Sequence, residues 1–138
     1  MAAEARGPLN INPLALQAPV APAPVSVSMA TAPENACAAV GFVIGRAAER
    51  ERIVAADILM DAIMGANESP LKRALLDAGI ADDALGYVAD SVAQPFAVVS
   101  LRGARSGAAE DLPAIVAAAP RPPPEAGPHR PPGRAAHS

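Results

Sequence analysis

Aromatic residues are nearly absent from this chain of 138 residues, which has no Trp, one Tyr and two Phe. Its residues are 51% hydrophobic, and alanine is the commonest of these. Alanine buries little apolar area, whereas full burial of a Leu or Phe side chain contributes roughly 1.5–3 kcal/mol. The sequence therefore predicts a core of small residues and a folded state of modest stability.

Basic charge is also scarce. The 11 Lys and Arg residues are outnumbered by 14 Asp and Glu residues, and the formal net charge is −3. A nucleic-acid-binding face would need clustered basic residues with aromatic residues between them, and a membrane-surface patch would need several adjacent Lys or Arg residues. We therefore expect neither nucleic acid nor membrane as a partner.

Long hydrophobic runs are missing as well. No apolar segment approaches the roughly 20 residues that cross a bilayer as a helix. Near the N-terminus, Glu4 and Arg6 are followed by PLNINPLALQAPVAPAP, whose prolines interrupt the helix that a secretory signal would form. The sequence is typical of a soluble protein, which we expect to be cytoplasmic.

Cysteine and histidine, the residues that most often build zinc sites, are rare. Cys37 is the only cysteine, so no internal disulfide can form and a reducing compartment is favoured. We expect Cys37 to be a small buried residue in a strand. Both histidines, His129 and His137, lie in a proline-rich tail, away from other ligands at metal-binding spacing. No catalytic residue, metal ligand or cofactor is predicted in this chain.

Proline divides the chain into three parts. Of its 16 prolines, 13 precede residue 34 or follow residue 119. Dense proline excludes helices and sheet interiors, so residues 1–33 are expected to form an extended leader and residues 120–138 a disordered tail with polyproline-II character. The tail is interpretable as a passive extension, as a PxxP ligand, or as sequence translated past a point where the natural domain would continue. Residues 34–119 are expected to form the folded domain.

A strand and a helix are the first elements expected in that domain. The apolar run CAAVGFVIG (37–45) predicts a strand that is buried on at least one side. Apolar residues recur at helical spacing over residues 48–65, which predicts a helix. Gly65 stands at its end, where a left-handed glycine commonly terminates a helix. The apolar residues form two adjacent stripes, which are Ile53, Ala56, Met60, Ile63 and Met64 in one and Ala55, Leu59 and Ala62 in the other.

A shorter helix is marked at both ends by the segment NESPLKRALLDAG (67–79). Ser69 is expected to cap the first turn, because its hydroxyl oxygen can accept a hydrogen bond from a backbone N–H that has no partner in the helix. Pro70 suits the first helical position, where its missing N–H costs nothing, and Gly79 ends the helix. The residues expected to face solvent are Lys72 and Arg73.

Two strands and a helix complete the domain. DDALGYVADSV (82–92) and PFAVVSLRG (95–103) lie close enough to form an antiparallel hairpin. SGAAEDLPAIVAAA (106–119) has helical composition, and Pro113 favours a helix that starts at Asp111. The order of elements predicts an α+β fold with helices packed on one face of an antiparallel sheet. Each strand has residues that share a face, which are Leu85, Tyr87 and Ala89 in the first and Ala97, Val99 and Leu101 in the second.

Several features of this domain together resemble one family of peptidases. They are the helix that leads into Gly65, the corner Ser69-Pro70-Leu71, the pair Leu75-Leu76, Gly79, and the Gln94-Pro95 step before a strand that ends at Gly103. On these features, residues 41–117 resemble part of the insulinase/pitrilysin family of metallopeptidases (peptidase family M16), and in particular its presequence-protease-like subfamily.

The resemblance implies a zinc peptidase built from repeated α+β domains that enclose a chamber for peptide degradation. In that family the inverted motif H-x-x-E-H and a further glutamate bind zinc, and the glutamate of the motif activates the water. The stretch matched here resembles a non-catalytic domain, and no histidine precedes Pro120. Zinc therefore belongs to the resembled family, and no catalytic or metal-binding residue is carried over to this chain.

Three functional hypotheses follow. The chain is expected to be a non-catalytic fragment of a presequence-protease-like metallopeptidase, one that supplies chamber wall or a peptide-binding surface. An edge of strand 96–102 could bind a peptide, or it could pair with a strand of the parent domain that is missing here. A partner chain or domain of the same family would then carry the zinc site. The alternatives are a non-enzymatic interaction module and a truncated gene product without independent function. Pro113 and the prolines after residue 119 depart from the family and favour truncation or a change of frame.

Other catalytic arrangements find no support in the sequence. Ser69, Ser91 and Ser100 have no histidine within the folded domain to activate them. Asp82 and Asp83 are adjacent carboxylates, but neighbouring residues of a strand point to opposite faces. A shared general acid–base role for these two residues is therefore not expected.

Overall fold

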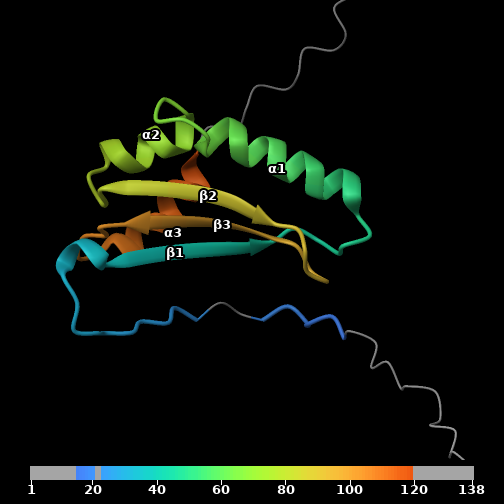
Figure 1. Ribbon diagram of the computed structural model, residues 1–138, viewed down its shortest axis with the longest axis horizontal. Helices are drawn as coiled ribbons and strands as arrows, with labels where there is room; N and C mark the ends of the chain where they lie inside the picture. The colour runs from blue at the N-terminus through green and yellow to red at the C-terminus, as the bar shows by residue number, and fades with distance from the viewer. Residues whose placement is uncertain (1–14, 21–22, 120–138) are drawn as a thin grey trace, which may run out of the picture.

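The computed structural model describes residues 15–20 and 23–119, which form one antiparallel sheet with three helices on one of its faces (Figure 1). In chain order the elements are η1 (Pro33–Asn35), β1 (Cys37–Val43), α1 (Arg50–Met64), α2 (Pro70–Asp77), β2 (Asp83–Ala89), β3 (Phe96–Arg102) and α3 (Ala108–Ala118). The predicted α+β fold is confirmed. None of the helices in this part of the chain is long and apolar enough to cross a membrane. The predictions for residues 1–14, 21–22 and 120–138, among them those for the tail and its histidines, lie outside the described residues.

The central strand of the sheet is β3, because the strand order is β1-β3-β2 and both neighbours run antiparallel to it. Consecutive β2 and β3 form the predicted hairpin. At the middle of β3, Val99 pairs with Val40 of β1 on one side and with Gly86 of β2 on the other. The face of β3 predicted from its alternation is buried beneath the helices, and its residues are Ala97, Val99 and Leu101.

Helix α1 packs along β2, which is an edge strand of the sheet (Figure 1). Met60 and Met64 of the predicted stripe are buried in the core. Gly86 permits this approach, because a β-carbon built there would lie 2.5 Å from Met60 Sδ and 2.9 Å from Met64 Cβ. The second predicted stripe is exposed, since a helix laid over an edge strand has only one side covered by the sheet. Its residues are Ala55, Leu59 and Ala62.

Helix α2 begins and ends where the sequence predicts. Pro70 is its first residue, and Gly79 follows its last turn with a φ of +66°, a conformation that glycine adopts without strain. Leu71 and Leu75, which lie one turn apart, are both buried in the core. The short helix is therefore held mainly by packing of these two side chains.

The corner between α1 and α2 differs from the prediction in two details. Ser69 is the N-cap residue of α2, but its Oγ accepts a hydrogen bond from the Ala66 N–H at 3.1 Å, inside the corner, and makes no bond to the helix. Gly65 has a right-handed φ of −69°, and its N–H continues the helical pattern by donating to the Asp61 carbonyl. A left-handed Gly65 was expected to turn the chain at this corner. The turn is stabilised instead by the hydrogen bond to the Ser69 hydroxyl.

Helix α3 begins at Ala108, three residues before the predicted start at Asp111. Ala108 and Leu112 are spaced one turn apart and are both buried, so packing favours a helix that includes them. Pro113 consequently lies inside the helix, where it removes the N–H that would reach the carbonyl of Ala109. Ala109 and Pro113 are both exposed, so water can bind this carbonyl.

Candidate functional site

The charged and polar side chains of residues 15–20 and 23–119 form no metal-binding cluster. No polar or charged residue in these ranges is buried, and no group of three or more His, Cys, Asp or Glu side chains among them is placed to hold a metal ion. Cys37, which was predicted to be buried, is exposed at the start of β1. It lies outside the core because its neighbour Ala38 takes the face that packs under the helices.

The adjacent carboxylates of Asp82 and Asp83 bind two different cations. Asp82 Oδ1 lies 3.4 Å from an Nη atom of Arg105, and Asp83 Oδ1 lies 3.2 Å from Lys72 Nζ. The backbone N–H of Ala84 and, after it, the ammonium of Lys72 lower the pKa of Asp83. Lys72 is therefore not solvent-facing as predicted, since its side chain is only 12% exposed against the sheet.

The serines considered as nucleophiles have other partners or stand apart from any base. Ser69 Oγ accepts from the backbone of the α1–α2 corner. Ser91 Oγ donates to Asp90 Oδ1 at 3.0 Å in the exposed β2–β3 turn. Ser100 is half-buried in β3, on the side of the sheet away from the helices. None of them is hydrogen-bonded to a histidine or lysine within the described ranges, so no activated hydroxyl is present there.

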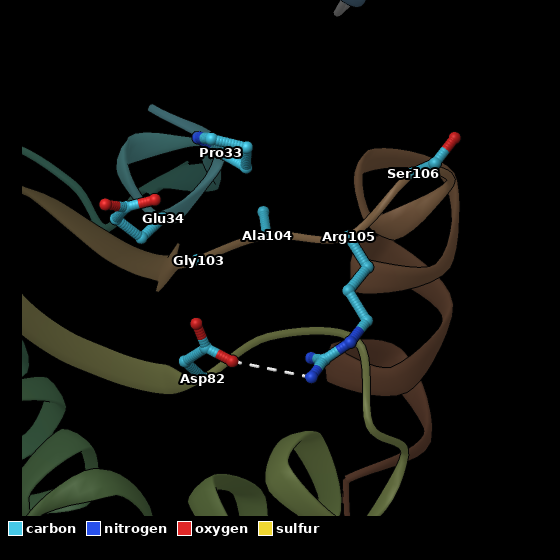
Figure 2. Close-up of a pocket in the computed structure, with 7 residues that line it drawn as sticks. All are labelled: Pro33, Glu34, Asp82, Gly103, Ala104, Arg105 and Ser106. Atoms are coloured by element: carbon cyan, nitrogen blue, oxygen red, sulfur yellow. Dashed lines mark hydrogen bonds and ion pairs between the residues drawn. The ribbon is translucent and has the colours of Figure 1, made fainter. Parts of the chain in front are cut away.

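A hollow of about 370 Å³ lies where β3 leads into α3 (Figure 2). Its charged groups are Glu34, Asp82 and Arg105, and Figure 2 shows the Arg105 side chain reaching across to Asp82 while Ser106 points away. The guanidinium is thus already paired, and the polar groups do not converge on one point. The remaining lining residues are Pro33, Gly103 and Ala104. This arrangement provides no set of groups for catalysis.

A second hollow, of about 260 Å³, lies between α1 and the end of β2. Its lining includes two carboxylates, those of Asp57 and Asp90, without a third metal ligand. The apolar lining residues are Ile53, Val54 and Val88. Like the first hollow, it contains no group of three described side chains placed to hold a metal ion.

The side of the sheet away from the helices, which we name the open face, consists mainly of apolar residues that are exposed or half-buried. Val43, Leu85 and Tyr87 on this face are 67%, 46% and 52% exposed. An exposed apolar patch of this kind commonly marks an interaction site. The open face consists of Ala39, Gly41 and Val43 of β1, Leu85, Tyr87 and Ala89 of β2, and Phe96, Val98 and Ser100 of β3.

The edges of the sheet are β1 and β2, so the prediction of a peptide-binding edge at residues 96–102 is wrong. Strand β3 pairs along its whole length with β1 on one side and β2 on the other. A strand with two partners has no free row of backbone N–H and C=O groups to offer. The sequence showed that three strands exist, but their order in the sheet was set by tertiary packing.

The edge of β2 is protected at its start. Asp83 Oδ1 accepts a hydrogen bond from the outward-pointing N–H of Ala84 at 2.8 Å, and the same carboxylate binds Lys72. Charged side chains at a strand edge are a common device against unwanted pairing, because an added strand would have to displace them. This edge is therefore a poor site for an added strand.

The edge of β1 has no such protection, since Cys37–Val43 contains no charged residue. Ile44 N–H donates to the Pro95 carbonyl at 2.8 Å. In an antiparallel pair every second residue bonds to the partner strand, so the even-numbered residues of β1 are the ones that bond to β3. By that alternation, the backbone groups of Ala39, Gly41 and Val43 point away from β3. This edge was not predicted from the sequence. A signal for it was present, because residues 37–43 contain no charged residue, whereas β2 begins with an aspartate.

Neither a scan against models of protein families nor a search of curated proteins found a match for this chain. The resemblance to the insulinase/pitrilysin family therefore stays a prediction. Among the described residues, the open face and the unprotected edge of β1 adjoin each other and form one candidate binding surface.

Proposed function

We propose that this chain is a non-catalytic, polypeptide-binding piece that holds an extended peptide along the outer edge of β1. The observation that carries the proposal is the uncharged edge of β1 next to the exposed apolar side chains of the open face. An extended peptide can pair its backbone with the outward N–H and C=O groups of Ala39, Gly41 and Val43, while alternate side chains rest on the open face.

The size of the open face favours a peptide over a folded partner. Three strands of seven residues, with about 4.8 Å between strands and about 3.4 Å per residue, give a face of roughly 14 by 24 Å, or about 340 Å². A stable interface between folded proteins buries about 800 Å² on each partner. An extended segment needs less area, because hydrogen bonds along the strand edge add to the apolar contacts.

The resemblance gives the proposal its more specific form. We propose that the chain acts as a wall or peptide-binding part of a presequence-protease-like metallopeptidase, with zinc and catalysis supplied by another chain or domain of that family. The lack of histidine before Pro120 supports a non-catalytic role. A cytoplasmic location fits the single cysteine, Cys37, which is exposed and unpaired.

Peptide binding tests this proposal directly. The probe is a dye-labelled, unstructured peptide of alternating Val and Ser, about eight residues long so that it spans β1. Gly41→Pro removes an outward N–H without breaking a bond to β3, and we expect it to weaken binding about tenfold, which corresponds to about 1.4 kcal/mol. Gly41→Ala is the matched control, because its β-carbon would meet nothing closer than 3.7 Å.

Two results would contradict the proposal. Equal fluorescence anisotropy titrations for Gly41→Pro and Gly41→Ala would show that the edge of β1 is not used. Cleavage of the peptide by the isolated chain, together with one bound zinc per chain, would show that the chain is itself a catalyst.

A second candidate function, an interaction module that binds a folded protein, is favoured by the outer side of α1. Val54, Ile58 and Leu59 there are 54%, 65% and 41% exposed. With this function, Ile58→Lys would weaken binding of the partner and Gly41→Pro would not. A truncated product without function would instead unfold in urea without a cooperative transition.

A further inference from the structure

Residues 25–29, which we name the strap, have the alternating pattern of a strand but lie outside the sheet. Val25, Val27 and Met29 are 87%, 83% and 77% exposed and alternate with Ser26 and Ser28. Strict alternation of apolar and polar residues is typical of a strand with one buried face. The apolar side of the strap has no partner among the described residues.

The segment that contains the strap is anchored near both ends of β1. After the strap, η1 leads directly into β1. Before it, the Gln17 N–H donates to Gln94 Oε1 at 2.8 Å, and Gln94 Nε2 donates to the Gln17 carbonyl at 3.1 Å. Gln94 precedes Pro95, whose carbonyl binds Ile44 just beyond the end of β1. The chain before η1 therefore returns along β1 in the opposite direction, as the blue trace in Figure 1 shows.

We propose that the strap adds to the outer edge of β1 as a fourth, antiparallel strand and covers the edge to which a peptide would bind. The structure has the open arrangement, in which no backbone hydrogen bond joins described residues of the strap to β1. The antiparallel direction follows from the reversal of the chain through η1. One register that satisfies the outward backbone groups of β1 pairs Val27, the middle residue of the strap, with Gly41, and this is the register we propose.

In this register the apolar side of the strap extends the open face. Residues paired directly across two strands point to the same face, so Val27 lies beside Gly41, which has no side chain to obstruct it. Val25 and Met29 then pair with Val43 and Ala39. The closed strap covers an uncharged edge that would otherwise be open to pairing between molecules.

The strap competes with any peptide for the same backbone groups. A tethered segment acts at an effective concentration in the millimolar range, so a free peptide gains access only while the strap is open. This competition rests on the proposed function, whereas the pairing of the strap with β1 does not.

Hydrogen exchange in the full chain tests the pairing without any peptide. The amides of Ala39, Gly41 and Val43 report on the edge of β1, because only a closed strap gives them a hydrogen-bond acceptor. We compare Val27→Pro, which removes an N–H directed at β1, with the matched control Ser28→Pro, whose N–H points away from β1 in the proposed register. Both variants place the same rigid residue in the same segment.

The expected result is protection of the three edge amides in the wild type and in Ser28→Pro, and exchange about tenfold faster in Val27→Pro. Equal exchange in all three proteins would overturn the proposal. Protection that disappears on dilution, in step with dissociation of a dimer seen by sedimentation, would overturn it too, because the strap would then belong to a second copy. Peptide affinity is measured separately, so failure of the proposed function is distinguished from failure of the strap.

Discussion

Helix α1 lies so close to β2 at Gly86 that Gly86→Ala is predicted to destabilise the folded chain. Strand propensity alone predicts the opposite effect. Glycine in a strand interior is less favourable than alanine by roughly 0.5–1 kcal/mol, so Gly→Ala is expected to stabilise a strand that has room for it. At Gly86 there is no room, because a β-carbon would lie 2.5 Å from Met60 Sδ, 2.8 Å from Met64 Cγ and 2.9 Å from Met64 Cβ.

The magnitude follows from which of these atoms can move. Met60 Sδ is near the end of a flexible side chain and can rotate away, but Met64 Cβ is attached to the backbone of α1. Relief of that contact requires α1 to shift away from β2, and overpacking of this kind costs about 1–3 kcal/mol. After subtraction of the gain from the strand, roughly 0–2.5 kcal/mol remains, and Gly86→Ala is expected to lower the free energy of unfolding by about 1 kcal/mol, near the middle of that range.

Urea unfolding followed by far-UV circular dichroism measures this effect, since the chain has no Trp for fluorescence. Gly41→Ala is the matched control, because Gly41 also lies in a strand beside β3 but its β-carbon would meet nothing closer than 3.7 Å. That variant is expected to be more stable by about 0.4–1 kcal/mol. If Gly86→Ala were as stable as the wild type or more so, the packing of α1 on β2 described above would be wrong.

Two further predictions concern α3 and the edge of β2. Pro113→Ala restores the N–H that the carbonyl of Ala109 lacks and is expected to raise the free energy of unfolding by about 1–3 kcal/mol in urea; unchanged stability would place Pro113 outside the helix. The pKa of Asp83 is lower in the folded chain than in the unfolded chain, so its stabilising effect is fully present above the ordinary value of about 3.9 and is lost as the pH falls through the lower, folded value. Asp83→Asn is therefore expected to be less stable than the wild type at pH 7 and to match it at about pH 2, and a constant difference between the two pH values would contradict this.

Local features of the sequence determined where most elements lie. The start of α2 at Pro70, its end at Gly79 and the buried alternation of β3 were all readable from residue types, because caps and alternation act over a few neighbouring residues. The α+β class followed from the order of these elements. The proposed non-catalytic role likewise rests on the absence of histidine before Pro120.

Where a local signal conflicts with burial, the prediction from the sequence was wrong. Pro113 favours a helix start at Asp111, yet α3 begins earlier because Ala108 and Leu112 are both buried in the core. Lys72 appeared to be a solvated residue of α2 until the sheet brought Asp83 within 3.2 Å of it. These outcomes depend on residues distant in the sequence, which no local pattern contains.

The candidate site was decided by tertiary structure alone. Ala84, Gly86 and Val88 of β2 face the helices, with Gly86 directly beneath Met60 and Met64. The alternate residues Leu85 and Tyr87 therefore lie on the open face. Because β3 is the central strand, the free edge lies at β1 and not at β3 as expected. By itself the sequence determined that a small α+β domain forms. Packing of α1, α2 and α3 on one side determined which apolar face and which strand edge remain open, because burial on one side of a sheet leaves the alternate residues on the other side exposed.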